Sequence, residues 1–225
     1  MTVEETTRGG CCSWRSYWPA VGGTVQPEAD RILVCGFGAF PGVTDNPTTD
    51  LVRSLPWRLG GFNVHRWVLP VSWQDSSAWL RRRVRAVSPH LLLLTGVGSR
   101  EGCAQLESGA DNRQNGQPDV QGDMLLPGPI DPRRKLTHRK SCPWPVGDLV
   151  EGLQRRGHLV EESSDAGSYL CNHTLYQALD LGVPAGTGFL HVRGGGYEGL
   201  GDPRRLAMME LIRSLHLVLR LNRER

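Results

Sequence analysis

The sequence has 225 residues, of which 39% are hydrophobic, and it contains 28 glycines and 15 prolines. A chain of this size can bury a sizeable core, and its composition favours many turns around a modest set of regular elements over a helical bundle or a disordered chain. The 26 basic and 23 acidic residues leave a net charge of +3, an excess too small to indicate a nucleic-acid partner.

The N-terminal sequence MTVEETTRGGCCSW has neither a basic region nor an apolar region of the kind found in signal peptides. The longest strongly apolar run, residues 91–94, is far shorter than a bilayer span, so we expect no membrane association. The six cysteines form no CxxC pair, and without a secretory signal a reducing compartment is the default. We therefore expect a cytoplasmic protein, and the cysteine spacing gives no support to a zinc ribbon.

Residues 1–29 show no sustained helix or strand period and are predicted to form an irregular extension, with one domain over residues 30–225. That domain opens with the continuous apolar run 32–36, which is typical of a strand buried on both faces. The loop that follows, Gly36–Gly42, is rich in glycine and proline. Asn46 is then suited to cap a helix, and Pro47 suits its first turn.

Strands and helices continue to alternate along the rest of the chain. Strands are predicted at 63–69, 90–96 and 188–192, with a short strand beginning at 159–160. Helices are predicted at 72–87, 145–156, 169–181 and from 202 onward, and residues 113–144 form a long surface excursion. This alternation predicts an α/β fold, a three-layer α/β/α sandwich with a mainly parallel central sheet. In such sheets, sites gather at the carboxyl ends of the strands.

Three residues are candidates for catalysis, although each also has an ordinary structural explanation. Cys171 lies just inside a predicted helix start, where the helix dipole activates a thiol, but lone cysteines are more often packed hydrophobes. His191 lies in an apolar strand and is either a base facing a cleft or a satisfied core histidine. Glu107 is either a carboxylate that orients a histidine or a surface glutamate.

At four separated places the chain resembles pyroglutamyl-peptidase I, a family of cysteine peptidases. The family motif GFGPFxGxxxNPS corresponds to residues 36–48. The last nine positions of its SxDAGRYLCN motif correspond to residues 164–172, with Ser168 as the one difference. The family's glutamate follows a strand-ending glycine by eleven residues, as Glu107 follows Gly96, and Asn112 matches the asparagine beyond it. The family's histidine strand corresponds to residues 189–193.

The resemblance implies a phosphorylase/hydrolase-like fold and the removal of an N-terminal pyroglutamyl residue from peptides, without metal or cofactor. It implies that Cys171 is the nucleophile, His191 the base and Glu107 the group that orients the base. Phe37 and Phe40 match the two aromatics that sandwich the pyroglutamyl ring. Further substrate-binding residues expected from these matches are Asn46, Gly96 and Val97. The resemblance also implies a homodimer or homotetramer.

The chain departs from the family pattern beside the predicted site. Arg193 replaces the proline that follows the histidine–valine pair, and three glycines follow it, which predicts a more mobile loop after the base. Ala39 replaces a proline between the two aromatics, and Ser168 replaces an arginine upstream of the nucleophile. The segment 112–130, which shapes one wall of the family's site, matches poorly.

Two alternatives remain open from the sequence. The same triad could act on another small N-acyl or lactam group. The glycines of the loop 36–42 could instead belong to a non-catalytic or nucleotide-binding module, although their spacing departs from the dinucleotide fingerprint and the neighbouring phenylalanines would crowd a pyrophosphate.

Overall fold

The computed structural model describes residues 29–223, apart from residues 41, 44, 99–101 and 103. The predicted N-terminal extension lies outside the described residues except for residue 29, so it stays a prediction. The first regular element begins at Asp30, close to the predicted start of the domain.

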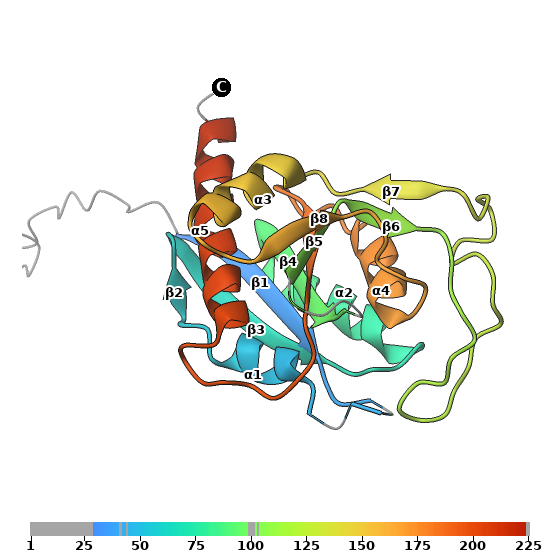
Figure 1. Ribbon diagram of the computed structural model, residues 1–225. Helices are drawn as coiled ribbons and strands as arrows, with labels where there is room; N and C mark the ends of the chain where they lie inside the picture. Colours follow the sequence, from blue (N-terminus) through green and yellow to red (C-terminus); the bar gives the residue numbers. More distant parts are fainter. Residues whose placement is uncertain (1–28, 41, 44, 99–101, 103, 224–225) are drawn as a thin grey trace, which may run out of the picture.

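A seven-stranded sheet forms the centre of the fold (Figure 1). Its strands are β1 (Asp30–Phe37), β2 (Arg58–Leu59), β3 (Phe62–Leu69), β4 (Leu91–Val97), β5 (Ala104–Glu107), β8 (Val160–Ser163) and β9 (Thr187–Val192). Their order across the sheet is β2-β3-β1-β4-β9-β5-β8. Neighbouring strands from β3 to β9 are parallel, whereas β5 runs antiparallel to β9 and parallel to β8. The mainly parallel sheet predicted from the sequence is confirmed.

Helices pack on both faces of this sheet. One face carries α1 (Pro47–Arg53), α3 (Val146–Arg155) and α5 (Pro203–Arg223), and the other carries α2 (Asp75–Val87) and α4 (Leu170–Ala178). Strand β1 shows why both faces need cover, because Ile32 and Val34 join one core cluster while Leu33 and Cys35 join the other. Successive side chains of a strand point to opposite faces, so a continuous apolar run feeds two cores. This is the predicted α/β/α sandwich.

Three features differ from the sequence prediction. Helix α2 begins at Asp75 and not at Ser72, whose hydroxyl instead accepts a hydrogen bond from the Asp75 amide at 3.2 Å. The stretch that contains Glu107 is a strand, β5, which the sequence pattern did not reveal. Within the long excursion, β7 (Arg139–Ser141) pairs with β6 (Gly109–Asp111) in a separate two-stranded sheet.

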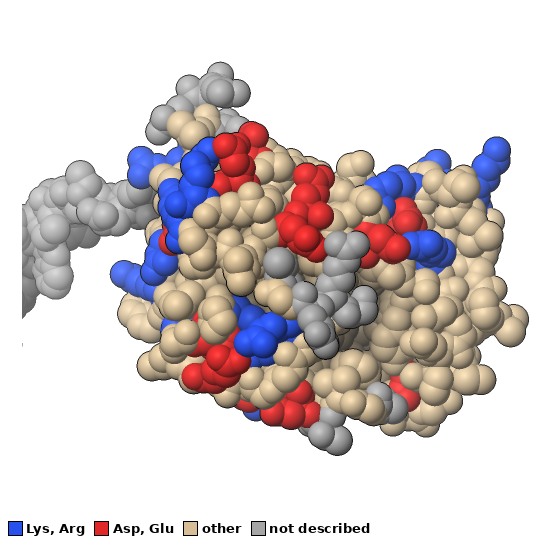
Figure 2. Space-filling model, in the orientation of Figure 1, with Lys and Arg blue, Asp and Glu red and all other residues tan. Residues whose placement is uncertain are grey.

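Charged side chains of both signs are interspersed on the face shown in Figure 2, and they form no continuous basic stripe there. Of the helices in the described part of the chain, none is long and apolar enough to cross a bilayer.

Candidate active site

The candidate residues meet where β4, β5 and β9 lie side by side. Gly96 on β4 pairs with His191 on β9, and His191 pairs with Gln105 on β5. Glu107 lies two residues beyond Gln105, so its side chain leaves the sheet on the same face as His191. The antiparallel register therefore places Glu107 level with Phe189, two residues before His191 on the same face of the sheet.

His191 and Glu107 form a buried hydrogen-bonded pair. Nδ1 of His191 lies 2.7 Å from Oε1 of Glu107, and the two residues are 6% and 0% exposed. The carboxylate accepts a hydrogen bond from the Nδ1–H group, so Nε2 is free to exchange a proton with a second partner. The sequence prediction that Glu107 orients His191 describes this contact, and the catalytic use of the contact is a proposal.

Cys171 is the second residue of α4, as the sequence pattern indicated. The first backbone hydrogen bond of this helix runs from the His173 amide to the Tyr169 carbonyl, so the amides of residues 170–172 precede the intrahelical ladder. The side chain of Tyr169, the N-cap residue of this helix, makes no capping hydrogen bond. The positive end of the helix dipole therefore lies at the thiol.

Gly96 packs directly against the thiol of Cys171. A β-carbon placed on Gly96 would lie 2.7 Å from Sγ of Cys171 and 2.9 Å from the ring of Phe189, closer than atoms can approach. The ring of Phe189 in turn lies 4.5 Å from that of His191, centroid to centroid. The thiol, the glycine and the base are thus packed against one another on one face of the sheet.

Cys171 affects the protonation of His191. Burial alone would lower the pKa of His191, but the charge of Cys171 and hydrogen bonds to Cys171 and Glu107 raise it to about 9. The raised pKa means that the protonated imidazole is favoured between the sulfur of Cys171 and the carboxyl group of Glu107. Such an arrangement can attack an acyl carbon through sulfur and deliver a proton to a leaving group.

Asn172, next to the thiol, fixes the start of α4. Its Oδ1 accepts a hydrogen bond from the Asp111 amide at 2.9 Å, and its Nδ2 donates to the carbonyls of Asp111 and Arg113. The side chain is fully buried. Sequence reasoning used Asn172 only as part of a motif and assigned it no role. The buried amide in the motif was the available signal, because such a group must satisfy its hydrogen bonds within the fold.

The predicted substrate-binding aromatics differ in their surroundings. Phe37, at the end of β1, is 3% exposed and belongs to the core cluster beneath α2 and α4. Phe40 is half-buried in the loop beyond it, and its ring centroid lies 6.4 Å from that of Tyr169, directly before α4. Val97 ends β4 and is half-buried. The binding of substrate by these residues stays a prediction.

The side chain of Asn46 forms its hydrogen bonds within its own loop. Its Oδ1 accepts hydrogen bonds from the amide and hydroxyl of Thr48, which makes it the predicted cap of α1, and its Nδ2 donates to the Gly38 carbonyl at 2.8 Å. Gly36 is required because a β-carbon there would lie 2.6 Å from the Thr48 carbonyl oxygen. The glycine therefore serves close packing of β1 on α1, which gives the nucleotide-binding alternative no support.

The other two cysteines in the described part of the chain are less suited to act as nucleophiles. Cys35, Cys142 and Cys171 are all free thiols, but burial raises the pKa of Cys142 to about 11 and that of Cys35 further still. These two thiols stay protonated at neutral pH and are poor nucleophiles.

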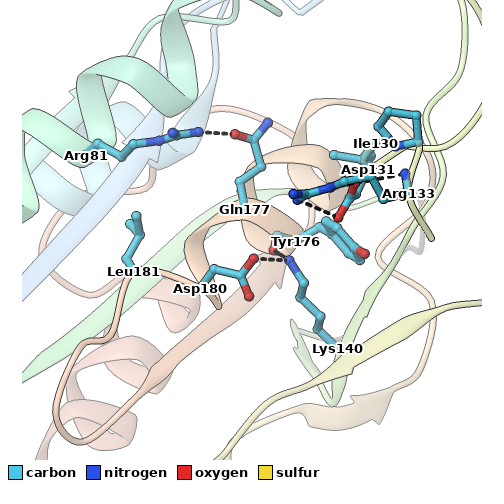
Figure 3. A pocket seen from close by; sticks show the side chains of 10 residues that line it. Arg81, Ile130, Asp131, Arg133, Lys140, Tyr176, Gln177, Asp180 and Leu181 are labelled. Atoms are coloured by element: carbon cyan, nitrogen blue, oxygen red, sulfur yellow. Dashed lines mark hydrogen bonds and ion pairs between the residues drawn. The ribbon is translucent and has the colours of Figure 1, made fainter.

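A separate cavity of about 480 Å³ lies along the C-terminal half of α4 (Figure 3). Four of its charged side chains form two ion pairs, since Lys140 contacts Asp180 at 2.6 Å and Arg133 contacts Asp131 at 2.9 Å. None of the catalytic or substrate-binding residues expected from the sequence lines it. The chemistry is therefore assigned to the end of the sheet and not to this cavity.

Comparison with known proteins points to one family. The family model for pyroglutamyl peptidase matches residues 30–195. A pyrrolidone-carboxylate peptidase of Halalkalibacterium halodurans is 30% identical over 82% of this chain and 88% of its own length. One from Streptococcus pyogenes is 30% identical over 72% and 77%. The crystal structure of pyrrolidone carboxyl peptidase from Thermus thermophilus superposes with a TM-score of 0.72 and 27% identity, covering 81% of this chain and 98% of that chain.

Proposed function

The chain belongs to the pyroglutamyl peptidase family, and we propose that it removes N-terminal pyroglutamyl residues through Cys171, His191 and Glu107. Family membership makes the protein a cysteine peptidase that acts on peptides. The observation that carries the residue assignment is the buried Glu107–His191 pair beside a thiol at a helix N-terminus.

In the proposed acylation step, the Cys171 thiolate attacks the carbonyl carbon that joins pyroglutamate to the next residue. The sulfur–carbon bond forms, and the carbonyl electrons move onto oxygen. Protonated His191 then gives its proton to the departing amine as the carbon–nitrogen bond breaks. Glu107 remains ionised and stabilises the imidazolium, so the products are a thioester and a peptide shortened by one residue.

Water completes the cycle by hydrolysing the thioester. Neutral His191 takes a proton from the water, the hydroxide oxygen bonds to the acyl carbon, and the thiolate leaves as the carbon–sulfur bond breaks. Free pyroglutamate departs and the thiolate–imidazolium pair is restored. The amides of residues 170–172, which point out of the start of α4, are the donors proposed for the oxyanion in both steps.

Selection of the substrate is proposed to depend on shape and stacking. The pyroglutamyl ring is small, flat and uncharged, and the half-buried Phe40 and Val97 offer apolar surface, while Phe37 lies in the core beneath α2 and α4. A glutamate with its free charges would lose its hydration in such surroundings without gaining a partner. Gly96 leaves room for the reacting carbon, and Asn46 shapes the loop that carries Phe40.

The test is hydrolysis of pyroglutamyl-coumarin by the full chain, beside coumarin amides of proline, alanine and an N-acetylated residue. We expect activity on the pyroglutamyl substrate alone, and loss of that activity after alkylation by iodoacetamide. Cys171→Ser is expected to abolish turnover with an unchanged thermal transition, whereas Cys142→Ser leaves turnover intact. Activity on the acetylated substrate alone would favour the alternative N-acyl hydrolase, and full activity of Cys171→Ser would refute the mechanism.

Two further features belong to the proposal. Cytoplasmic location is proposed because a peptidase that depends on a free thiolate needs a reducing compartment, and the described cysteines are all reduced. A homodimer or homotetramer is proposed from the family resemblance, and sedimentation velocity of the purified chain would determine which one forms.

A further inference from the structure

The segment directly after the base has only one side chain beyond glycine, that of Arg193. Strand β9 ends at Val192, one residue beyond His191, and the chain continues as Arg193 and three glycines. Glycine loses more conformational freedom on folding than any other residue, so this segment is costly to order. The side chain of Arg193 points to Glu198, an exposed ion pair that contributes little.

One buried guanidinium holds this segment. Arg204, at the start of α5, is 4% exposed and pairs with Asp202, which is fully buried. Its Nη1 and Nη2 groups donate hydrogen bonds, at 2.6 to 3.2 Å, to four consecutive backbone carbonyls, those of Arg193, Gly194, Gly195 and Gly196.

Asp202 forms hydrogen bonds to the C-terminal part of the same loop. Its carboxylate accepts hydrogen bonds from the Glu198 amide at 3.0 Å and from the Arg204 amide at 2.9 Å, in addition to the guanidinium. The segment from 193 to 204 is therefore a loop whose two ends and backbone converge on one ion pair. The mobility expected from the glycines alone is opposed by these bonds.

The held segment packs on the predicted site. A β-carbon on Gly194 would lie 3.6 Å from Cγ1 of Val97, and one on Gly196 would lie 3.4 Å from Oδ2 of Asp45, in the loop between Phe40 and Asn46. The amide of Gly98 donates to the Val192 carbonyl at 2.9 Å. The end of β9 thus contacts both the end of β4 and the substrate-binding loop.

We propose that Arg204, with Asp202 as its counter-ion, is a positioning residue that fixes the segment 193–196 and thereby holds His191 in line with Cys171. This inference rests on the proposed function. Arg193 stands where the family pattern has a proline, and the guanidinium of Arg204 supplies by hydrogen bonds the rigidity that a proline ring supplies by covalent restraint.

The test compares Arg204→Lys with the double variant R193P/R204K. Lysine keeps the charge opposite Asp202 but lacks the planar fork of donors that reaches four carbonyls. We expect kcat of Arg204→Lys to fall about tenfold or more, because the segment that follows the base is released. KM should change by less than about twofold, because Phe40 and Val97 are held by their own loop and strand. Proline at 193 should restore much of kcat, since Val192 already has the extended conformation that precedes a proline.

A second measurement needs no peptide substrate. The rate of Cys171 alkylation by iodoacetamide at about pH 6, where ordinary thiols stay protonated, reports the thiolate held by His191. We expect Arg204→Lys to lower this rate and R193P/R204K to restore it. Peptide mapping by mass spectrometry separates Cys171 from the other cysteines. This arm stays informative if the wild-type chain does not hydrolyse pyroglutamyl-coumarin, a result that would overturn the proposed function instead.

The matched control is Arg205→Lys on the same turn of α5. Arg205 donates to Ser54 and to the Leu200 carbonyl and does not contact the glycine segment, so kcat and alkylation should stay at the wild-type level. Equal losses in the two Arg→Lys variants, or wild-type values for Arg204→Lys, would overturn the role of Arg204. If Arg204→Lys alone does not fold, a folded but slow R193P/R204K would have the same consequence.

Discussion

Sγ of Cys171 lies so close to the backbone of Gly96 that a β-carbon at position 96 would be only 2.7 Å from it. Gly96 is paired with His191 across β4 and β9, so the thiol rests on the strand pair that carries the base. The position of the thiol is therefore determined both by its contact with the sheet and by the start of α4. A change of one methyl group at this point should act on the chemistry before it acts on the fold.

Gly96→Ala is the first prediction. The new methyl group must displace the thiol or the ring of Phe189, and a reacting atom moved by about 1 Å costs about 10²-fold in rate. We expect kcat for pyroglutamyl-coumarin to fall by about that factor. Gly152→Ala, in the middle of α3, is the control because only a flexible arginine end lies near its β-carbon. It should retain full activity and gain about 0.5–1 kcal/mol in free energy of unfolding.

The second prediction concerns the charge of Glu107. Glu107→Gln keeps the size of the side chain, and its amide oxygen can accept a hydrogen bond from the Nδ1–H group of His191. It cannot stabilise an imidazolium by charge. We expect kcat/KM to fall about 10³-fold, within the range that acid–base groups contribute. The control is Glu162→Gln on β8, where the side chain is exposed. Similar activities of the two variants would contradict the assigned role of Glu107.

The third prediction is the pH dependence of the reaction. The thiolate and Glu107 raise the pKa of His191 to about 9 against the effect of its burial. Because the imidazolium must donate a proton to the leaving amine, kcat/KM should fall as pH rises through about 9. Glu107→Gln should move this alkaline limb to lower pH. A wild-type limb at the ordinary histidine pKa of about 6.5 would contradict the arrangement.

The same titration affects stability, with a definite sign. A histidine whose pKa is higher in the folded chain stabilises the fold while it is protonated. The contribution of His191 is complete below about pH 6.5, the ordinary pKa, and is lost as pH rises through about 9. Urea unfolding of the wild type should show this loss, and His191→Gln should not.

Local sequence was sufficient to predict most of the layers of the fold. Continuous apolar runs such as 91–94 and the helix signals around Asn46 and Cys171 depend on neighbouring residues only, and the structure has a strand or a helix start at each. The four-residue strand β5 could not be found in this way, because Gln105 and Glu107 interrupt its apolar pattern and its antiparallel direction depends on partners far along the chain.

The arrangement of the site was predictable only through family resemblance. Glu107 and His191 are 84 residues apart, and nothing in either local pattern specifies their contact. The role of Arg204 was missed for a related reason. An arginine at a helix start is ordinarily a solvated side chain, and its burial becomes apparent only when the glycine segment is folded back onto it.

The last prediction separates the two phenylalanines that the family resemblance grouped together. Phe37 is almost fully buried in the core, so Phe37→Ala should cost about 3–5 kcal/mol in free energy of unfolding. Phe40 is half-buried beside Tyr169, so Phe40→Ala should unfold near the wild-type temperature while KM for pyroglutamyl-coumarin rises several-fold. Phe40→Leu, which keeps apolar bulk but loses the ring face, should show most of the same rise in KM if stacking holds the substrate. Wild-type KM in both Phe40 variants would instead place the pyroglutamyl ring away from this loop.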